Sequence, residues 1–199
     1  MWHPRPLPRR FFARHSVVVA RALIGHLLVH QTADGLTIGR IVEAEAYGGA
    51  DDGASHARRR TARSAIMFGP PGVAYVYLSY GVHWCLNVVT EEQGTPGAVL
   101  LRALEPVEGA ALMRCRVPAA PPARVASGPG RLTRAMAVWG IHNGADLTRP
   151  PLYIADGAPG RRPLVVGPRI GVSRAADRPW RFGLAGSRAL SRPFPARRL

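Results

Sequence analysis

The segment Val73-Ala-Tyr-Val-Tyr-Leu-Ser-Tyr-Gly-Val-His-Trp-Cys-Leu-Asn-Val-Val89 joins two β-rich runs through a turn signal and predicts a β-hairpin. A two-residue turn would mix the faces, whereas a three-residue turn, Ser79-Tyr80-Gly81, separates them. The strands then run from Val73 to Leu78 and from Val82 to Val89, with Gly81 left-handed and Tyr80 at the tip. One face carries Tyr75, Tyr77, His83, Cys85 and Asn87, and the opposite face carries Val76, Leu78, Val82, Trp84 and Leu86.

A second hairpin is predicted upstream. The dipeptide Asp34-Gly35 is a strong turn signal between a strand at Leu27–His30 and a longer strand at Leu36–Tyr47. Before them, Ser16 is suited to cap a helix over Val17–Ile24, which the following glycine ends.

The strand at Leu36–Tyr47 places two carboxylates on one face. Its alternation separates the small apolar set Val42, Ala44 and Ala46 from the set Ile41, Glu43, Glu45 and Tyr47. Acids are scarce, because only 12 Asp and Glu residues stand against 27 basic ones. The pair is interpreted either as surface salt bridges or as a general base that also stabilises a developing cation.

The spacing of these two carboxylates bears on the reaction type. Glu43 and Glu45 on a strand lie roughly 6.5–7 Å apart, within the range of an inverting sugar hydrolase. However, side chains at i and i+2 point in parallel, whereas acid and base must flank the glycosidic bond. Ordinary glycoside hydrolysis is therefore disfavoured, and cleavage of a sugar–base bond stays open.

The rest of the chain adds helices, short strands and loops to these hairpins. The predicted segments are a polar loop (Gly48–Arg63), a strand (Ala98–Ala103) that contains Arg102, a helix (Pro106–Arg116), a Pro-rich loop (Arg116–Ala126), a helix that starts at Ser127-Gly128-Pro129, and short strands at Leu152–Ile154, Leu164–Val166 and Trp180–Leu184. Together they predict a single α+β domain with a curved antiparallel sheet, surrounding helices and a protruding β-hairpin. The domain is expected over residues 11–191, between flexible basic ends at 1–10 and 192–199.

The charge favours a polyanionic partner. The formal net charge is +15 and every basic residue is an arginine. Codon bias in a GC-rich genome can account for part of this excess, but a protein this basic still attracts nucleic acid. The absence of lysine excludes a phosphate-loop lysine and a lysine Schiff base, so a mechanism that uses water is favoured.

Other classes of site have little support. Two cysteines, Cys85 and Cys115, form neither a disulfide framework nor a metal box, and the seven histidines form no metal motif. We therefore expect no metal and no organic cofactor. The acid-free first 33 residues resemble an organellar presequence, but Ser16–Leu28 fits a folded domain better. No apolar stretch is long enough to span a membrane, so a cytoplasmic, nucleoid-associated bacterial protein is expected.

Tyr80 at the tip of the hairpin is the second notable feature. An aromatic side chain on a basic surface is suited to wedge between base pairs. Together with the face that carries Tyr75 and Tyr77, it predicts flipping of a base out of the duplex.

These segments resemble the alkyladenine (3-methyladenine, or methylpurine) DNA glycosylase family from about Phe11 to Leu190. The matching segments are Arg40–Tyr47, Ser55-His56, Met67-Phe68, Gly72–Gly81, Cys85–Asn87, Val99–Pro106, Ser127–Pro129 and Arg169–Val172. The resemblance implies monofunctional, hydrolytic removal of alkylated purines such as 3-methyladenine and 7-methylguanine from duplex DNA, by a monomer.

Residue roles follow from the same resemblance. It implies that Glu45 activates water and that Arg102 lies near this water. Tyr47 and Tyr77 correspond to aromatic residues that sandwich the base, and His56 contacts the base. Asn87 disfavours normal guanine by crowding its 2-amino group, and Tyr80 intercalates.

Several points stay open. Gly94–Gly97 and Arg116–Ala126 match no segment of the family, and Met67–Gly72 has an additional proline and no lysine. Glu43 has no clear family role, and a structural role is favoured over a catalytic one. The rival interpretations are a nucleic-acid-binding module that has lost catalysis and a hydrolase of small nucleosides. The preferred lesion is not predicted, nor is the source of a proton for neutral leaving bases.

Overall fold

The computed structural model describes residues 4–157 and 163–195. Its strands are β1 (Leu27–Thr32), β2 (Gly35–Tyr47), β3 (Ala74–Ser79), β4 (His83–Val89), β5 (Ala98–Glu108), β6 (Leu152–Ala155), β7 (Leu164–Gly167) and β8 (Arg181–Leu184). Its helices are α1 (Arg9–Phe12), α2 (Ser16–Leu23), α3 (Ala110–Arg116) and α4 (Pro129–Ala135), with short 3₁₀ turns η1 (His56–Arg58), η2 (Ala65–Phe68), η3 (Pro122–Arg124) and η4 (Gly140–His142).

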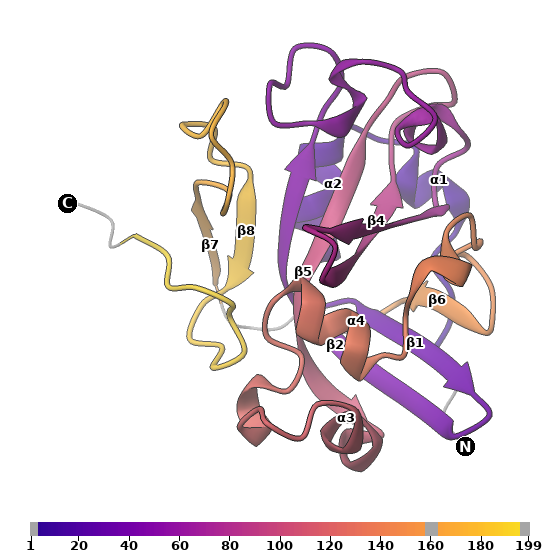
Figure 1. Cartoon of the computed structure of the whole chain (residues 1–199), viewed down its shortest axis with the longest axis vertical. Helices are drawn as coiled ribbons and strands as arrows, with labels where there is room; N and C mark the ends of the chain where they lie inside the picture. The colour runs from indigo at the N-terminus through magenta and orange to yellow at the C-terminus, as the bar shows by residue number, and fades with distance from the viewer. Residues whose placement is uncertain (1–3, 158–162, 196–199) are drawn as a thin grey trace.

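The strands form one antiparallel sheet in the order β3-β4-β5-β2-β1-β6, and β8 pairs with both β2 and β7 (Figure 1). The sheet curls around a core to which β2 and β5 each contribute more buried side chains than any other helix or strand. Helix α2 packs on β2 and β5, and α4 packs on β4 and β5. The predicted single α+β domain with a curved antiparallel sheet is confirmed.

Strand β2 is shared between two neighbours along one edge. Residues 35–40 pair with β1, and Glu43–Glu45 pair with β8. The change of neighbour coincides with register shifts against β5 between Ile41 and Ala44. This β-bulge breaks the predicted alternation, because Ile41 joins Val42 in the main core and does not share the face of the two glutamates.

The helix before β1 has its predicted length, but it begins and ends one residue earlier than predicted and has a different cap. Helix α2 covers Ser16–Leu23, and the ring nitrogen of His15 accepts the N–H of Val17. Ser16, predicted as the cap, is the first helical residue, and its hydroxyl is buried. The cap therefore lies one residue earlier than the sequence signal indicated.

The hairpin of β3 and β4 has the predicted length of turn in a shifted register. Ser79 pairs with His83, so the three intervening residues are Tyr80, Gly81 and Val82. The faces are unchanged, because a shift of the paired positions by two residues preserves the alternation. Both Tyr80 (φ 50°) and Gly81 (φ 70°) are left-handed, as in a type I′ turn. A left-handed tyrosine costs about 1–2 kcal/mol, so Tyr80 carries local strain.

Strand β5 is longer than predicted and changes the start of the following helix. It continues to Glu108, and Pro106 pairs with Gly39 beside a register shift. Helix α3 begins only at Ala110, after a left-handed Gly109. Pro106, predicted in the first turn of a helix, therefore lies at an irregular point of a strand, where a missing N–H is tolerated.

Residues near both ends of the described chain contact the domain. Pro6 bridges to Ala155, Leu7 is buried, and Arg9 forms a 2.8 Å ion pair with Asp146, so residues 4–10 pack on the domain. Near the other end, Arg181 donates hydrogen bonds to the carbonyls of Arg192 and Pro193. Residues 4–10 and 192–193, which fall in the predicted flexible ends, therefore contact the domain, while residues 1–3 and 196–199 lie outside the described residues.

Candidate active site

Glu45 is fully buried near the end of β2 and is held by three donors. Its Oε2 accepts hydrogen bonds from the Tyr47 hydroxyl at 2.9 Å and from Arg102 Nη1 at 3.1 Å. Its Oε1 accepts the backbone N–H of Ile170 at 2.7 Å. Burial raises the pKa of the Glu45 carboxyl, although all three donors favour its charged form. Glu45 is therefore a more basic carboxylate than an exposed glutamate, and it is fixed in one orientation.

Glu43 has a different set of partners, although it lies only two residues away. Its Oε1 accepts hydrogen bonds from Arg102 Nε and Arg181 Nη1, both at 3.1 Å, and from the Ser191 hydroxyl at 2.8 Å. The backbone N–H of Ser191 donates to Oε2. Two buried arginines and two further donors thus surround this carboxylate.

Arg102 connects the two carboxylates. Its Nε bonds Glu43, its Nη1 bonds Glu45 and its Nη2 bonds the Ser191 hydroxyl at 3.2 Å. Its pKa is raised: burial disfavours the charged form, but Glu45 and Glu43 more than compensate. The guanidinium stays charged, and its hydrogen bond fixes the position of the Glu45 carboxylate.

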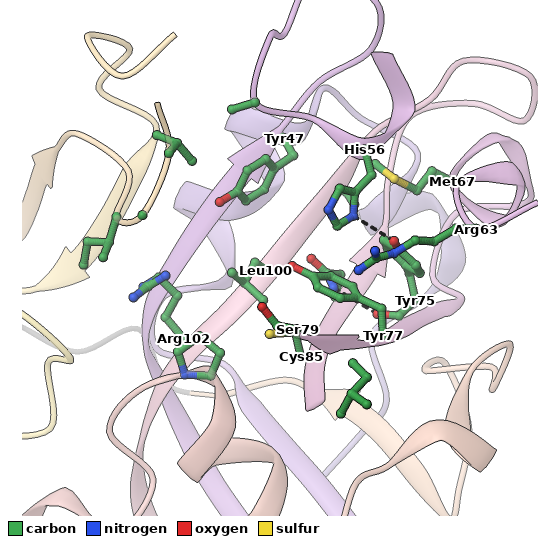
Figure 2. Close-up of a pocket in the computed structure, with 18 of the residues that line it drawn as sticks. Tyr47, His56, Arg63, Met67, Tyr75, Tyr77, Ser79, Cys85, Leu100 and Arg102 are labelled. Atoms are coloured by element: carbon green, nitrogen blue, oxygen red, sulfur yellow. Dashed lines mark hydrogen bonds between the residues drawn. The ribbon is translucent and has the colours of Figure 1, made fainter. Parts of the chain in front are cut away.

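A pocket of about 510 Å³ lies beside Glu45. Three groups that contact Glu45, namely Tyr47, Arg102 and Ile170, line this pocket (Figure 2). The other lining residues include His56, Arg63, Met67, Tyr75, Tyr77, Tyr80, Cys85, Asn87, Leu100 and Val172. A volume of this size accommodates a nucleotide. The Glu45 carboxylate does not itself line the pocket, but its hydrogen-bond partners do.

Aromatic side chains form opposite walls of the pocket. Figure 2 shows Tyr47 on one side and His56 with Tyr77 on the other. The His56 ring lies edge-on to Tyr77, with centroids 4.7 Å apart, and its Nδ1 is 2.8 Å from the Tyr75 hydroxyl. Burial, and then the charge of Arg63, lower the pKa of His56, so the ring is neutral at pH 7. The walls therefore present π-faces and no positive imidazolium.

The hairpin supplies the remaining predicted residues. Asn87 is buried and its amide donates to the Tyr75 carbonyl at 3.0 Å, which fixes the orientation of the side chain. Tyr80 lies at the turn with 93% of its surface exposed. Six of the seven predicted site residues thus line one pocket, and the seventh, Glu45, is hydrogen-bonded to three residues of its lining.

The sequence did not single out the pair of Asp52 and Arg169. Both side chains are fully buried and joined by two hydrogen bonds of 2.6 and 2.7 Å. The Arg169 guanidinium also lies 4.8 Å from the centroid of the Tyr47 ring, and the next residue, Ile170, donates to Glu45. Asp52 was visible only as one acid of a polar loop, and its partner is 117 positions away.

The wall of the pocket also carries a charged side chain. Arg63 places its guanidinium 4.6 Å from the centroid of the Tyr77 ring, so a cation already lies on this aromatic wall. Among the described residues, no three His, Cys, Asp or Glu side chains are grouped as metal ligands.

No helix in the described part of the chain is long and apolar enough to cross a membrane.

A buried, oriented carboxylate beside an aromatic pocket, on a strongly basic domain, suits an enzyme that acts on a base of nucleic acid. The model of the family described as "Methylpurine-DNA glycosylase (MPG)" matches residues 10–188. The chain therefore belongs to the methylpurine-DNA glycosylase family, which confirms the resemblance.

Curated relatives agree over almost the whole chain. A protein of Rhodopseudomonas palustris (strain HaA2) is 50% identical over 189 residues, which cover 95% of this chain and 92% of the relative. One from Anaeromyxobacter dehalogenans (strain 2CP-C) is 51% identical, covering 95% of this chain and 88% of the relative. One from Frankia casuarinae is 49% identical, with 94% and 93% covered. All three are named "Putative 3-methyladenine DNA glycosylase".

Proposed function

We propose that the protein removes alkylated purines of the 3-methyladenine and 7-methylguanine type from duplex DNA and leaves an abasic site. It flips the damaged nucleotide into the pocket and hydrolyses the sugar–base bond with water alone, as a monofunctional monomer. The observation that carries this proposal is Glu45, a buried carboxylate of raised pKa whose three donors include the pocket residues Tyr47 and Arg102. The names of the relatives support the choice of lesion.

The chemistry follows from the charge of the lesion. A purine alkylated at N3 or N7 is cationic, so the electrons of the C1′–N9 bond neutralise it as it leaves. Positive charge then develops on the sugar, and the Glu45 carboxylate stabilises it. Glu45 accepts one proton from a water molecule, whose hydroxyl bonds to C1′. No general acid is required for a leaving group of this kind.

The walls of the pocket would select a flat cation. Tyr47 and Tyr77 offer π-faces on which a cationic ring stacks favourably. His56 is neutral at pH 7 and therefore does not repel the base. Asn87 would crowd the 2-amino group of normal guanine, and its fixed amide suits that role. Tyr80 would fill the gap in the duplex that the flipped nucleotide leaves.

The decisive experiment replaces Glu45 by Gln. Base release from a duplex that carries one 3-methyladenine should fall by about 10²–10⁴-fold, because a general base is lost. Binding to the same duplex should persist, because the pocket and the charges on the surface are unchanged. Release at the parental rate would refute the catalytic role of Glu45, and a parent protein that releases no base would favour a module that only binds.

A second experiment separates DNA from small substrates. The parent protein is offered free 3-methyladenosine and the damaged duplex in parallel. Cleavage of the nucleoside but not of the duplex would refute the proposal and favour a nucleoside hydrolase. Tyr80→Ser should lower excision from the duplex at an unchanged melting temperature, because the side chain is exposed.

The cellular setting follows from this substrate. A DNA-repair enzyme would work in the bacterial cytoplasm, associated with the nucleoid. A panel of duplexes that carry 3-methyladenine, 7-methylguanine, ethenoadenine or hypoxanthine would define the range of lesions. Neutral lesions need a proton on the leaving base, so a strong preference for the two cationic lesions is expected.

A further inference from the structure

A second groove lies on the opposite side of the β3–β4 hairpin from the base pocket. It measures about 640 Å³, and β4, α4 and the residues before η4 enclose it. Its lining residues are Asp34, Val82, His83, Trp84, Arg116, Gly130, Thr133, Arg134, Ala137, Val138 and Trp139. None of the residues assigned above to base excision belongs to this set.

The hairpin forms a wall between the two cavities. Tyr77 pairs with Cys85 and both line the base pocket, whereas Trp84, the next residue on β4, lines the second groove. Tyr80 at the tip lies between them. A nucleic acid that is wedged open by Tyr80 therefore meets the base pocket on one side of the hairpin and the second groove on the other.

The groove is built by close backbone approaches. A Cβ at Gly130 of α4 would lie 2.8 Å from the His83 ring, and a Cβ at Gly140 would lie 2.7 Å from the Trp84 ring. The Thr133 hydroxyl also donates to the Trp84 carbonyl at 3.0 Å. The two glycines and this hydrogen bond hold β4 close to α4 and η4, so the groove has a defined shape.

Exposed apolar side chains form its rim. Val82 is 68% exposed and Trp139 is 44% exposed. Trp139 follows two residues after Ala137, which has a left-handed backbone (φ 53°) without being a glycine. Such a conformation costs about 1 kcal/mol or more and tends to mark functional segments. The strained turn therefore holds an aromatic ring at the mouth of the groove.

The polar part of the groove carries net positive charge. Arg116 is engaged with Asp34 at 3.3 Å and with the Ala135 carbonyl at 3.1 Å. Arg134 is exposed, and its guanidinium forms no hydrogen bond or ion pair with the residues that the structure describes. One arginine is thus neutralised locally, and the other is available to an anionic ligand.

From these features we infer that the groove binds the backbone of the complementary strand, opposite the lesion. Arg134 contacts a phosphate of that strand, and Val82 and Trp139 pack on its sugars. The inference rests on the proposed function, because the lesion strand then enters the pocket on the other side of Tyr80. It assigns the two faces of one hairpin to the two strands of the duplex.

The experiment measures binding to a duplex with a tetrahydrofuran abasic-site analogue, which needs no catalysis. Arg134→Gln should reduce the salt dependence of log Kd by about one unit of slope, because one phosphate contact is lost. Trp139→Ala should weaken binding at an unchanged slope. The control is Arg21→Gln, which removes the same charge from an exposed position of α2, outside the groove; its slope should equal that of the parent protein.

The strand is identified with uncharged methylphosphonate linkages. One such linkage, placed opposite the lesion in the complementary strand, should weaken binding by the parent protein about as much as Arg134→Gln does. The same linkage should not weaken binding by the Arg134→Gln variant any further. The same coupling found only with linkages in the lesion strand would overturn the inference, as would an unchanged slope for Arg134→Gln. Failure of the proposed function is a separate result: the parent protein would bind but release no 3-methyladenine.

Discussion

Glu43 and Glu45 occupy the same strand two residues apart, yet their surroundings differ. Arg102 of β5, Arg181 of β8 and both polar groups of Ser191 surround Glu43. Glu45 faces the pocket with one arginine, one tyrosine hydroxyl and one backbone N–H. Burial raises the pKa of the Glu45 carboxyl.

The difference shows that hydrogen-bond partners give two chemically identical side chains different properties. The two arginines and Ser191 make Glu43 an anchor for the chain's C-terminal part. Burial keeps Glu45 more basic than an exposed glutamate, as the proposed transfer of a proton from water requires. Arg102 bonds both carboxylates, so the anchoring of Glu43 also fixes the position of Glu45.

The largest expected effect on this comparison comes from Glu43→Gln. It leaves Arg181 and part of Arg102 buried without a counter-charge, which costs about 3–5 kcal/mol of unfolding free energy. Urea denaturation measures it, and Glu45→Gln is the matched control.

The effect of Glu45→Gln on stability depends on pH, in a direction that follows from the pKa of Glu45. The pKa of Glu45 is raised in the folded state, so its contribution to stability is present at low pH and is lost as the pH rises through that pKa. Glu45→Gln therefore avoids this loss and should be far less destabilising at pH 7 than Glu43→Gln. Equal destabilisation by the two variants would mean that the two carboxylates do not differ in the way described.

The sequence predicted the carboxylate pair and, through the family resemblance, different roles for its two members, but it did not predict the partners that distinguish them. The two hairpins and Glu45 follow from local patterns, namely turn signals, alternation and a family motif. The partners of Glu43 lie as far as 148 positions away, and no local pattern encodes such contacts. The bulge at Ile41 and the early His15 cap were missed for a related reason, because tertiary packing overrides local preference there.

A smaller effect is expected from Asp52→Asn, which acts on the region of Glu45 alone. Burial raises the pKa of Asp52, but the Arg169 hydrogen bonds outweigh this and lower it. The contribution of Asp52 to stability is therefore present above its ordinary pKa of 3.8 and is lost as the pH falls through the lower folded value. Loss of the pair should cost about 3 kcal/mol and free Arg169, so that Ile170 no longer holds Glu45.

Two measurements distinguish positioning from mere destabilisation. In the Asp52→Asn variant, kcat for 3-methyladenine release should fall at a temperature where the variant is fully folded, and KM should change little. Arg178, a partly buried residue that pairs with the exposed Asp51, provides the control: Arg178→Gln should change neither constant. A parental kcat in folded Asp52→Asn would show that the pair serves stability only.

The smallest expected effect is a shift in pH dependence caused by Tyr47→Phe. The hydroxyl of Tyr47 donates to Glu45 and favours the charged carboxylate, so removing it raises the pKa of Glu45 further. Since Glu45 must be deprotonated to accept a proton from water, the acid limb of the kcat profile should move to higher pH by up to about one unit. The ring for stacking remains. Tyr77→Phe is the matched control, because the hydroxyl of Tyr77 forms no hydrogen bond with Glu45, whose described partners are Tyr47, Arg102 and Ile170. An acid limb that moves to lower pH in Tyr47→Phe, or equally in both variants, would contradict the assignment of this limb to Glu45.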